Sequence, residues 1–164
     1  MKKVLLLIII AIISVNASAQ DTSSSAITID SLSVKLEKLQ HDYDFLLCGF
    51  ELYRIMAEQS ELNQDIKIQT NAILLDIYNS KYNRDLYKAY LDSYDINSAL
   101  FEQQKEYYEQ KKKFVMFKAI TSGFSETEIS LIELDFKKID NGIAEVKSSL
   151  KYYKFLVDAY RDKR

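Results

Sequence analysis

The sequence contains no proline and only three glycines, Gly49, Gly123 and Gly142. Proline and glycine are the main residues that interrupt helices, and a sheet needs frequent turns to connect its strands. No long stretch keeps the alternation of apolar and polar residues that a half-buried strand requires. The composition therefore predicts an all-helical fold with long helices and few loops.

Cysteine and histidine are equally scarce, with one residue of each, Cys48 and His41. A single cysteine excludes an intrachain disulfide, so the fold must rest on apolar packing. Free cysteines are usually buried like small apolar residues, and pairing with a second chain is the alternative for Cys48. One histidine is too few for the two Glu-x-x-His pairs of a di-iron bundle, and the Cys-x-x-Cys-His motif for haem is absent. We expect no cofactor.

The one cluster with metal-binding residue types is His41-Asp42-Tyr43-Asp44. Consecutive helical residues point in different directions, so these side chains cannot converge on one ion without help from another helix. A nucleophilic triad would also have to use His41, and the sequence has no nucleophile elbow, phosphate-binding glycine loop or zinc motif. These observations predict neither a metal site nor an enzyme.

Residues 1–19 have the pattern of a cleaved secretory signal peptide. Lys2 and Lys3 precede the apolar stretch 4–15, and Ala17-Ser18-Ala19 supplies small residues for a cleavage site. An apolar run of about 12 residues is shorter than the roughly 20 that cross a bilayer, so cleavage is favoured over an anchor. We expect export to the periplasm or the cell exterior, with no integral membrane segment left after cleavage.

The remainder of the chain divides into a polar, serine-rich leader at 20–29, predicted to be flexible, and one domain at 30–164. The full sequence holds 24 acidic and 22 basic residues. Loss of the two lysines of the signal peptide would make it still more acidic. An acidic chain is a poor nucleic-acid binder, so we expect no nucleic-acid partner.

The most regular apolar stripe recurs at alternating spacings of three and four near the C-terminus, and only a long helix gathers such a stripe on one face. Its members are Ile129, Ile132, Phe136, Ile139, Ile143, Val146, Leu150, Tyr153, Val157 and Tyr160. Gly123, followed by a capping box of Ser125 and Glu128, predicts a turn before this helix. The helix should continue to about Asp162.

A similar stripe near the start of the domain predicts a helix that begins at Asp30 and buries that stripe. Its members are Leu32, Leu36, Leu39, Tyr43, Leu46, Phe50 and Tyr53. The stripe loses its phase after Tyr53, which indicates either a turn at 59–62 or a stutter in one very long helix. We favour the turn, followed by helices at about 61–94 and 97–120.

The predicted fold is an antiparallel up-down four-helix bundle with long, coiled-coil-like helices. The alternative is an elongated three-helix coil in which the first two helices are fused. In the four-helix arrangement the first and fourth helices are antiparallel neighbours. Gly49 and Gly142 would then let these two helices approach closely at mid-height.

Tyrosine suits partly wet contacts because it combines a large ring with a hydroxyl group. Tyr87, Tyr90, Tyr94 and Tyr152 are the tyrosines that the stripes explain least, and we take them as candidates for a partner surface. The basic run Lys111-Lys112-Lys113 is a further candidate, for an anionic partner. Packing at the edge of the core is the alternative for the tyrosines, and a solvated helix face is the alternative for the lysines.

These features favour an exported, non-enzymatic module that binds another protein or a second copy of itself. A second hypothesis is a holdase-type chaperone, because the chain resembles small helical periplasmic chaperones in size, export and helicity, although it has none of their motifs. A third is an inhibitor or immunity protein directed against a secreted toxin or enzyme.

Overall fold

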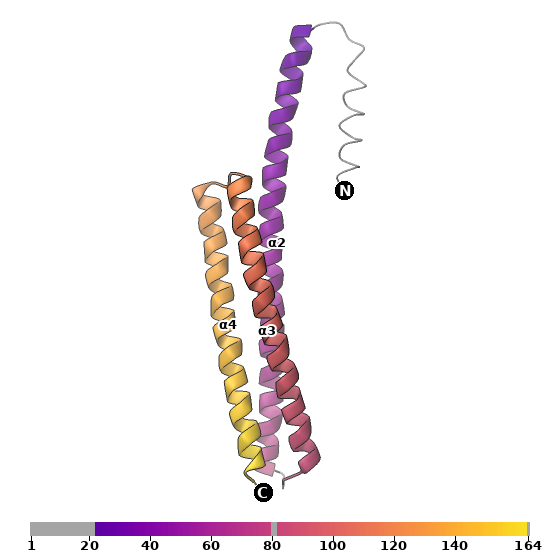
Figure 1. Ribbon diagram of the computed structural model, residues 1–164, viewed down its shortest axis with the longest axis vertical. Coiled ribbons are helices and arrows are strands. Elements are labelled where there is room, and N and C mark those ends of the chain that lie inside the picture. Colours follow the sequence, from indigo (N-terminus) through magenta and orange to yellow (C-terminus); the bar gives the residue numbers. More distant parts are fainter. Residues whose placement is uncertain (1–21, 80–81, 164) are drawn as a thin grey trace. The chain divides into compact units, whose positions relative to one another are not determined.

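The computed structural model describes the backbone of residues 22–79 and 82–163, and the side chains of these ranges from residue 29 onward. Within these ranges there are three helices and no strand: α2 (Thr22–Asn79), α3 (Arg84–Thr121) and α4 (Glu126–Arg161) (Figure 1). The signal peptide predicted at 1–19 lies outside the described residues. None of the helices in these ranges has a stretch both long and apolar enough to cross a membrane.

The all-helical fold is confirmed, but the four-helix bundle is not: the described residues form three helices, as in the three-helix alternative. Helix α2 continues without interruption through 59–62, where a turn was expected. It also begins at Thr22, so most of the segment predicted as a flexible leader is helical. The junction expected between the helices at 61–94 and 97–120 lies inside α3. Helix α2 ends at Asn79 and α3 begins at Arg84, so the chain is interrupted within the segment predicted as the second helix.

The chain divides into two compact units, 1–42 and 43–164. The described part of the first unit is the N-terminal portion of α2, on which Leu32, Leu36 and Leu39 are exposed. The second unit is a three-helix bundle formed by the remainder of α2 together with α3 and α4. In this bundle α3 runs back beside α4 (Figure 1).

Helix α4 confirms its predicted stripe. Eight of its ten members are buried, and Ile129 and Ile143 are partly buried against the same core. The capping box is also confirmed, because Ser125 Oγ accepts from the backbone of Glu128 and the Glu128 carboxylate accepts from the backbone of Ser125. Gly123 has φ +66°, the left-handed conformation expected at a helix C-terminus.

Helix α2 turns a different stripe towards the bundle from the one that the sequence suggested. The inward residues of the second unit again alternate at spacings of three and four over most of their length. They are Cys48, Leu52, Ile55, Gln59, Leu62, Ile66 and, one heptad later, Ile73. The predicted stripe lies on the opposite side of the helix and is exposed, so the prediction that it forms core is wrong.

The bundle core consists of two apolar clusters with a polar layer between them. Leu52 and Ile55 belong to the first cluster, with Tyr108 and Ile139, and Leu62 belongs to the second. This layer holds the buried Gln59 of α2, whose side chain lies against Gly142 of α4. The amide of Gln104 donates to the backbone carbonyl of Glu58 at 3.3 Å.

Helices α2 and α4 run in the same direction, because α3 lies between them in the chain. Asn63 of α2 accordingly meets Glu145 and Ser149 of α4, with Ser149 Oγ donating to Asn63 Oδ1 at 2.7 Å. The expected antiparallel contact at two glycines is therefore wrong. A β-carbon at Gly49 would meet nothing within 4 Å, whereas one at Gly142 would lie 2.6 Å from Gln59 Oε1.

Candidate functional site

The outward side of α2 in the second unit carries four large apolar residues, Tyr43, Leu46, Phe50 and Tyr53, which we call the outer face. Each is between 53% and 69% exposed. Their spacings of three, four and three place them along one line of the helix. The outer face is thus an apolar stripe that is separate from the core stripe on the same helix.

The charged residues among 43–57 do not add charge to the outer face, because each is engaged towards the bundle. Asp44 is buried, where it accepts from Lys118 Nζ at 2.9 Å and from Ser122 Oγ at 2.7 Å. Glu51 pairs with Lys111 Nζ at 3.0 Å. Arg54 pairs with Glu51 at 3.1 Å and also contacts the hydroxyl of Tyr107.

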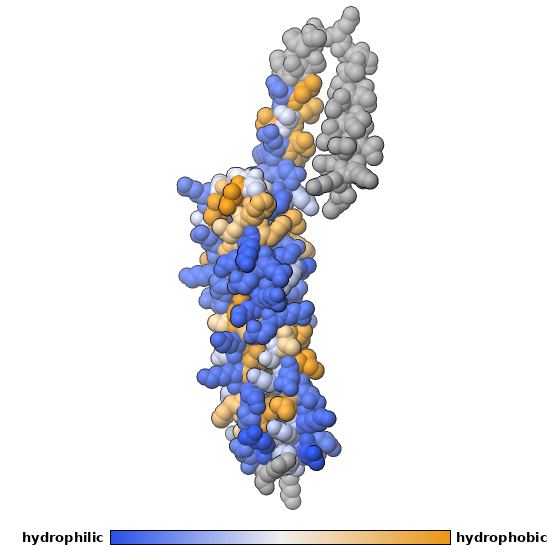
Figure 2. Space-filling view, in the orientation of Figure 1, coloured by the Kyte–Doolittle hydropathy of each residue, from blue (hydrophilic) through white to orange (hydrophobic). Residues whose placement is uncertain are grey.

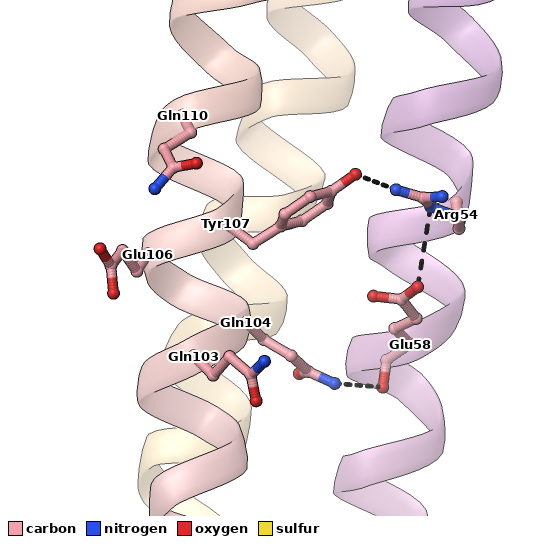
Figure 3. A pocket seen from close by; sticks show the side chains of 7 residues that line it. All are labelled: Arg54, Glu58, Gln103, Gln104, Glu106, Tyr107 and Gln110. Atoms are coloured by element: carbon pink, nitrogen blue, oxygen red, sulfur yellow. Dashed lines mark hydrogen bonds and ion pairs between the residues drawn. The ribbon is translucent and has the colours of Figure 1, made fainter.

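These pairings connect α2 to α3, and a polar groove of about 520 Å³ lies beside them. Figure 3 shows Arg54 of α2 meeting the hydroxyl of Tyr107, and the amide of Gln104 of α3 extending to the backbone carbonyl of Glu58. The groove is lined by Arg54, Glu58, Gln103, Gln104, Glu106, Tyr107 and Gln110. Side-chain amides and carboxylates can hydrogen-bond a polar ligand, but this lining includes no cysteine, serine or histidine that could act as a nucleophile or a neutral-pH base.

The spacing of the charged residues contains local signals for the Arg54 network. Glu51 and Arg54 are three residues apart and Arg54 and Glu58 are four apart, the spacings at which helical side chains meet. Tyr107 and Lys111 have the same four-residue spacing on α3. The contact of the two sets depends on how α2 and α3 pack, which the spacing within one helix does not determine.

The predicted tyrosine surface is only partly on the surface. Tyr87, Tyr90 and Tyr94 are half-buried against the second core cluster. The ring of Tyr94 stacks on Tyr153 with centroids 6.2 Å apart, and the ring of Tyr90 meets Tyr160 edge-on at 5.7 Å. These three residues therefore pack at the edge of the core, the alternative that the sequence left open.

Hydrogen bonds fix the same tyrosines in place at the end of the bundle where α2 connects to α3. The hydroxyl of Tyr90 bonds the carboxylate of Asp76, and the hydroxyl of Tyr153 donates to the backbone carbonyl of Tyr90 at 3.2 Å. Burial raises the pKa of Tyr90, and the bond to Asp76 adds to the effect. Asn83, the N-cap of α3, donates its backbone N–H to Tyr160 Oη at 3.2 Å.

Tyr152 differs from the other three candidates because it is exposed and stacks on another exposed ring, Phe155, at 6.3 Å. The structure does not bring it together with Tyr87, Tyr90 or Tyr94 through any of these ring contacts. Tyr152 also borders a shallow groove between α2 and α4 with Lys67 and Ser148.

Two of the three lysines of the basic run contact other residues of the bundle. Lys111 pairs with Glu51, and Lys112 lies 3.7 Å from Asp140 and 5.2 Å from the ring centroid of Phe136. Lys113 is exposed. Two of the three charges are thus neutralised by the protein itself, which weakens the case for an anionic partner at this run.

The cluster at His41 does not form a metal site among the described residues, where no group of three or more histidine, cysteine or carboxylate side chains is placed to hold an ion. His41 Nδ1 lies 3.3 Å from Asp42 in the first unit. Asp44, in the second unit, is engaged by Lys118 and Ser122. Cys48 is free and fully buried, and burial raises the pKa of its thiol, with a smaller contribution from Asp44.

Comparison with known proteins indicates no family for this chain. The chain matches no protein-family model, no curated protein and no solved structure.

Proposed function

We propose that this protein is an exported, non-enzymatic interaction module that binds a helical segment of a protein along the outer face of α2. The observation that supports this function is the outer face itself, four large apolar side chains in a line that the bundle leaves in water. Exposed apolar patches of this kind are typical of protein-binding surfaces.

The chemistry of the outer face favours a protein helix over a charged partner. Helices that dock on helices present apolar residues at the same alternating spacings of three and four. Helices that bind anionic membrane surfaces instead flank their apolar side with several lysines and arginines. Residues 43–57 hold one basic residue, Arg54, and its charge is paired with Glu51.

Figure 2 shows one side of the molecule, on which hydrophilic residues cover most of the area and hydrophobic residues appear in separate groups. Ile68 and Leu75 are also exposed on the same side of α2, but they lie about four helical turns or more beyond Tyr53, and the intervening positions on that side are polar or small. They provide matched controls for the docking surface.

Photo-crosslinking in the native cell tests this function. A benzophenone amino acid replaces Phe50 in one variant and Leu75 in the other, both on exposed positions of α2. We expect a discrete protein adduct at position 50 that is absent at position 75. Equal adducts at both positions, or none at position 50, would contradict the proposal.

Export is part of the same proposal and rests on the charged, apolar and small-residue pattern of residues 1–19. Intact mass of the protein recovered from the cell envelope or medium tests it. We expect a mass that corresponds to a chain beginning near Gln20. Recovery of the uncleaved chain from the cytoplasm would contradict this part.

A further inference from the structure

The geometry of the outer face points to a specific occupant. We infer that a second copy of this chain packs on Tyr43, Leu46, Phe50 and Tyr53, so that two α2 helices pair through their outer faces. This inference rests on the proposed function, because it names the helical partner of the same surface.

The spacing of the four side chains supports pairing with an identical helix. The order of spacings, three then four then three, is the same from either end of the stripe. A copy related by a two-fold axis therefore offers a matching stripe, and each side chain enters a gap between side chains of the other helix.

The absence of unpaired charge on the outer face also favours a second copy. Two copies bring identical surfaces together, so any free charge would meet the same charge on its partner unless the axis offset it. Asp44, Glu51 and Arg54 are all engaged within the bundle at distances of 2.9–3.1 Å. The two faces can thus approach without burying a like-charged pair.

The area of the outer face fits a symmetric dimer. Three aromatic side chains and one leucine, each more than half exposed, present on the order of 500 Å² of accessible surface. Two copies together would bury about 1,000 Å², which is where specific protein interfaces begin. Self-pairing removes both apolar faces from water in one event, whereas an unrelated partner covers only one copy.

Helix α2 is apolar on two sides between Tyr43 and Ala57, a pattern that indicates two packed neighbours. One side is covered by α3 and α4 through Cys48, Leu52 and Ile55. No helix among the described residues of the second unit covers the other side. A second α2 supplies that neighbour.

Sedimentation equilibrium of the protein as the cell processes it, from micromolar to submillimolar concentration, tests the inference. We expect the mass to rise from one chain to two. The double variant Leu46→Lys/Phe50→Lys should weaken association by about a hundredfold or more, because pairing would bury unpaired ammonium groups. The control Leu134→Lys/Phe155→Lys adds the same charge at an exposed leucine and an exposed phenylalanine of α4 and should dimerise like the wild type.

Circular dichroism shows whether each variant remains folded, and Leu46→Asn/Phe50→Asn replaces the lysine pair if that variant is unstable. A wild-type chain that stays monomeric at all concentrations, or a dimer that survives both outer-face variants, would overturn the inference. A monomer whose crosslink at position 50 joins it to a different protein would overturn the second copy and leave the proposed function standing. A monomeric wild-type chain with no protein crosslink at position 50 would overturn both the inference and the proposed function.

Discussion

The side-chain carbonyl of Gln59 occupies the space beside Gly142 that a β-carbon would otherwise fill. The ideal β-carbon of residue 142 would lie 2.6 Å from Gln59 Oε1, which is closer than unbonded atoms approach. This relationship joins α2 to α4 at the polar layer between the two apolar clusters. It explains why a glycine is accommodated in the middle of a long helix.

Alanine at Gly49 and at Gly142 should therefore have different effects. Alanine favours a helix interior over glycine by about 1 kcal/mol, and a β-carbon at Gly49 meets no atom within 4 Å. Gly49→Ala should raise the free energy of unfolding by about 0.5–1 kcal/mol. Gly142→Ala should gain less or lose stability, because the buried Gln59 amide must move. Urea unfolding measures both.

The background variant Gln59→Ala isolates the contact with Gly142. Removing the long side chain frees the space, so Gly142→Ala should recover most of the helix-propensity gain in that background. A double-mutant cycle gives the coupling directly. Additive effects of the two substitutions would show that Gln59 and Gly142 do not constrain each other.

The ion pair between Lys118 and the buried Asp44 should contribute more than an exposed pair on the same bundle. Lys118→Ala leaves the Asp44 carboxylate in the core with Ser122 but without its cation. We expect a loss of about 3 kcal/mol in the free energy of unfolding, the lower end for breaking a buried ion pair, because Ser122 still bonds the carboxylate. Lys138→Ala removes an exposed pair with Asp135 and should change stability by less than about 1 kcal/mol. Similar losses in both variants would contradict the assignment.

Three tyrosines that are buried wholly or in part should make the protein less stable in alkali. Burial raises the pKa values of Tyr90, Tyr108 and Tyr153 above the ordinary value of about 10. Below that value these groups are protonated in both states, so their contribution is fully present. As pH rises above it, the unfolded chain releases protons first and the free energy of unfolding falls.

Melting temperature measured against pH should accordingly decline above about pH 10. Tyr90→Phe should reduce this decline, although at neutral pH it loses about 1 kcal/mol with its hydrogen bond to Asp76. Tyr78→Phe, which removes a hydroxyl from an exposed ring, should decline like the wild type. An unchanged slope in Tyr90→Phe would contradict the role of this residue.

The Cys48 thiol should report opening of the bundle. It is fully buried, and burial raises its pKa, so both access and thiolate content are low in the folded chain. Alkylation should be slow in buffer and rapid in denaturant, and a non-reducing gel should show no disulfide-linked dimer. Fast labelling of the folded chain would contradict this placement.

Much of the hairpin formed by α3 and α4 could be predicted from the sequence. The stripe from Ile129 to Tyr160 is wide, continuous and almost wholly apolar, so its phase leaves one choice of buried face. Gly123, Ser125 and Glu128 are local signals that need no knowledge of tertiary structure. Their positions predicted the turn and the start of α4 correctly.

The buried face of α2 is harder to predict from the sequence, because this helix carries two stripes with heptad spacing. The outer stripe is uniformly apolar as far as Tyr53 and then ends, which suggested a turn. The inner stripe keeps its phase from Cys48 to Ile66 but includes Gln59, so it reads as interrupted. Which stripe is buried depends on the partners Lys118 and Gly142, which lie far away in the sequence.

The connection between α2 and α3 was missed for a related reason. Its signals are Asn79 and the N-cap Asn83, residues that are common in turns but far weaker than proline or glycine. The spacing of the tyrosines on both sides of this connection suggested one amphipathic helix that continues through it. Their contacts with Tyr153 and Tyr160 of α4 place them at the end of the core and explain why they were not available as a partner surface.

The orientation of α2 is tested most directly by the same substitution at two leucines of that helix, measured by urea unfolding at a concentration where the chain is monomeric. Leu52 is fully buried and Leu46 is 69% exposed. Leu52→Ala should lower the free energy of unfolding by about 2–5 kcal/mol, while Leu46→Ala should change it by less than about 0.5 kcal/mol. A large loss at Leu46 with little effect at Leu52 would show that the outer face belongs to the core and that α2 has the opposite orientation.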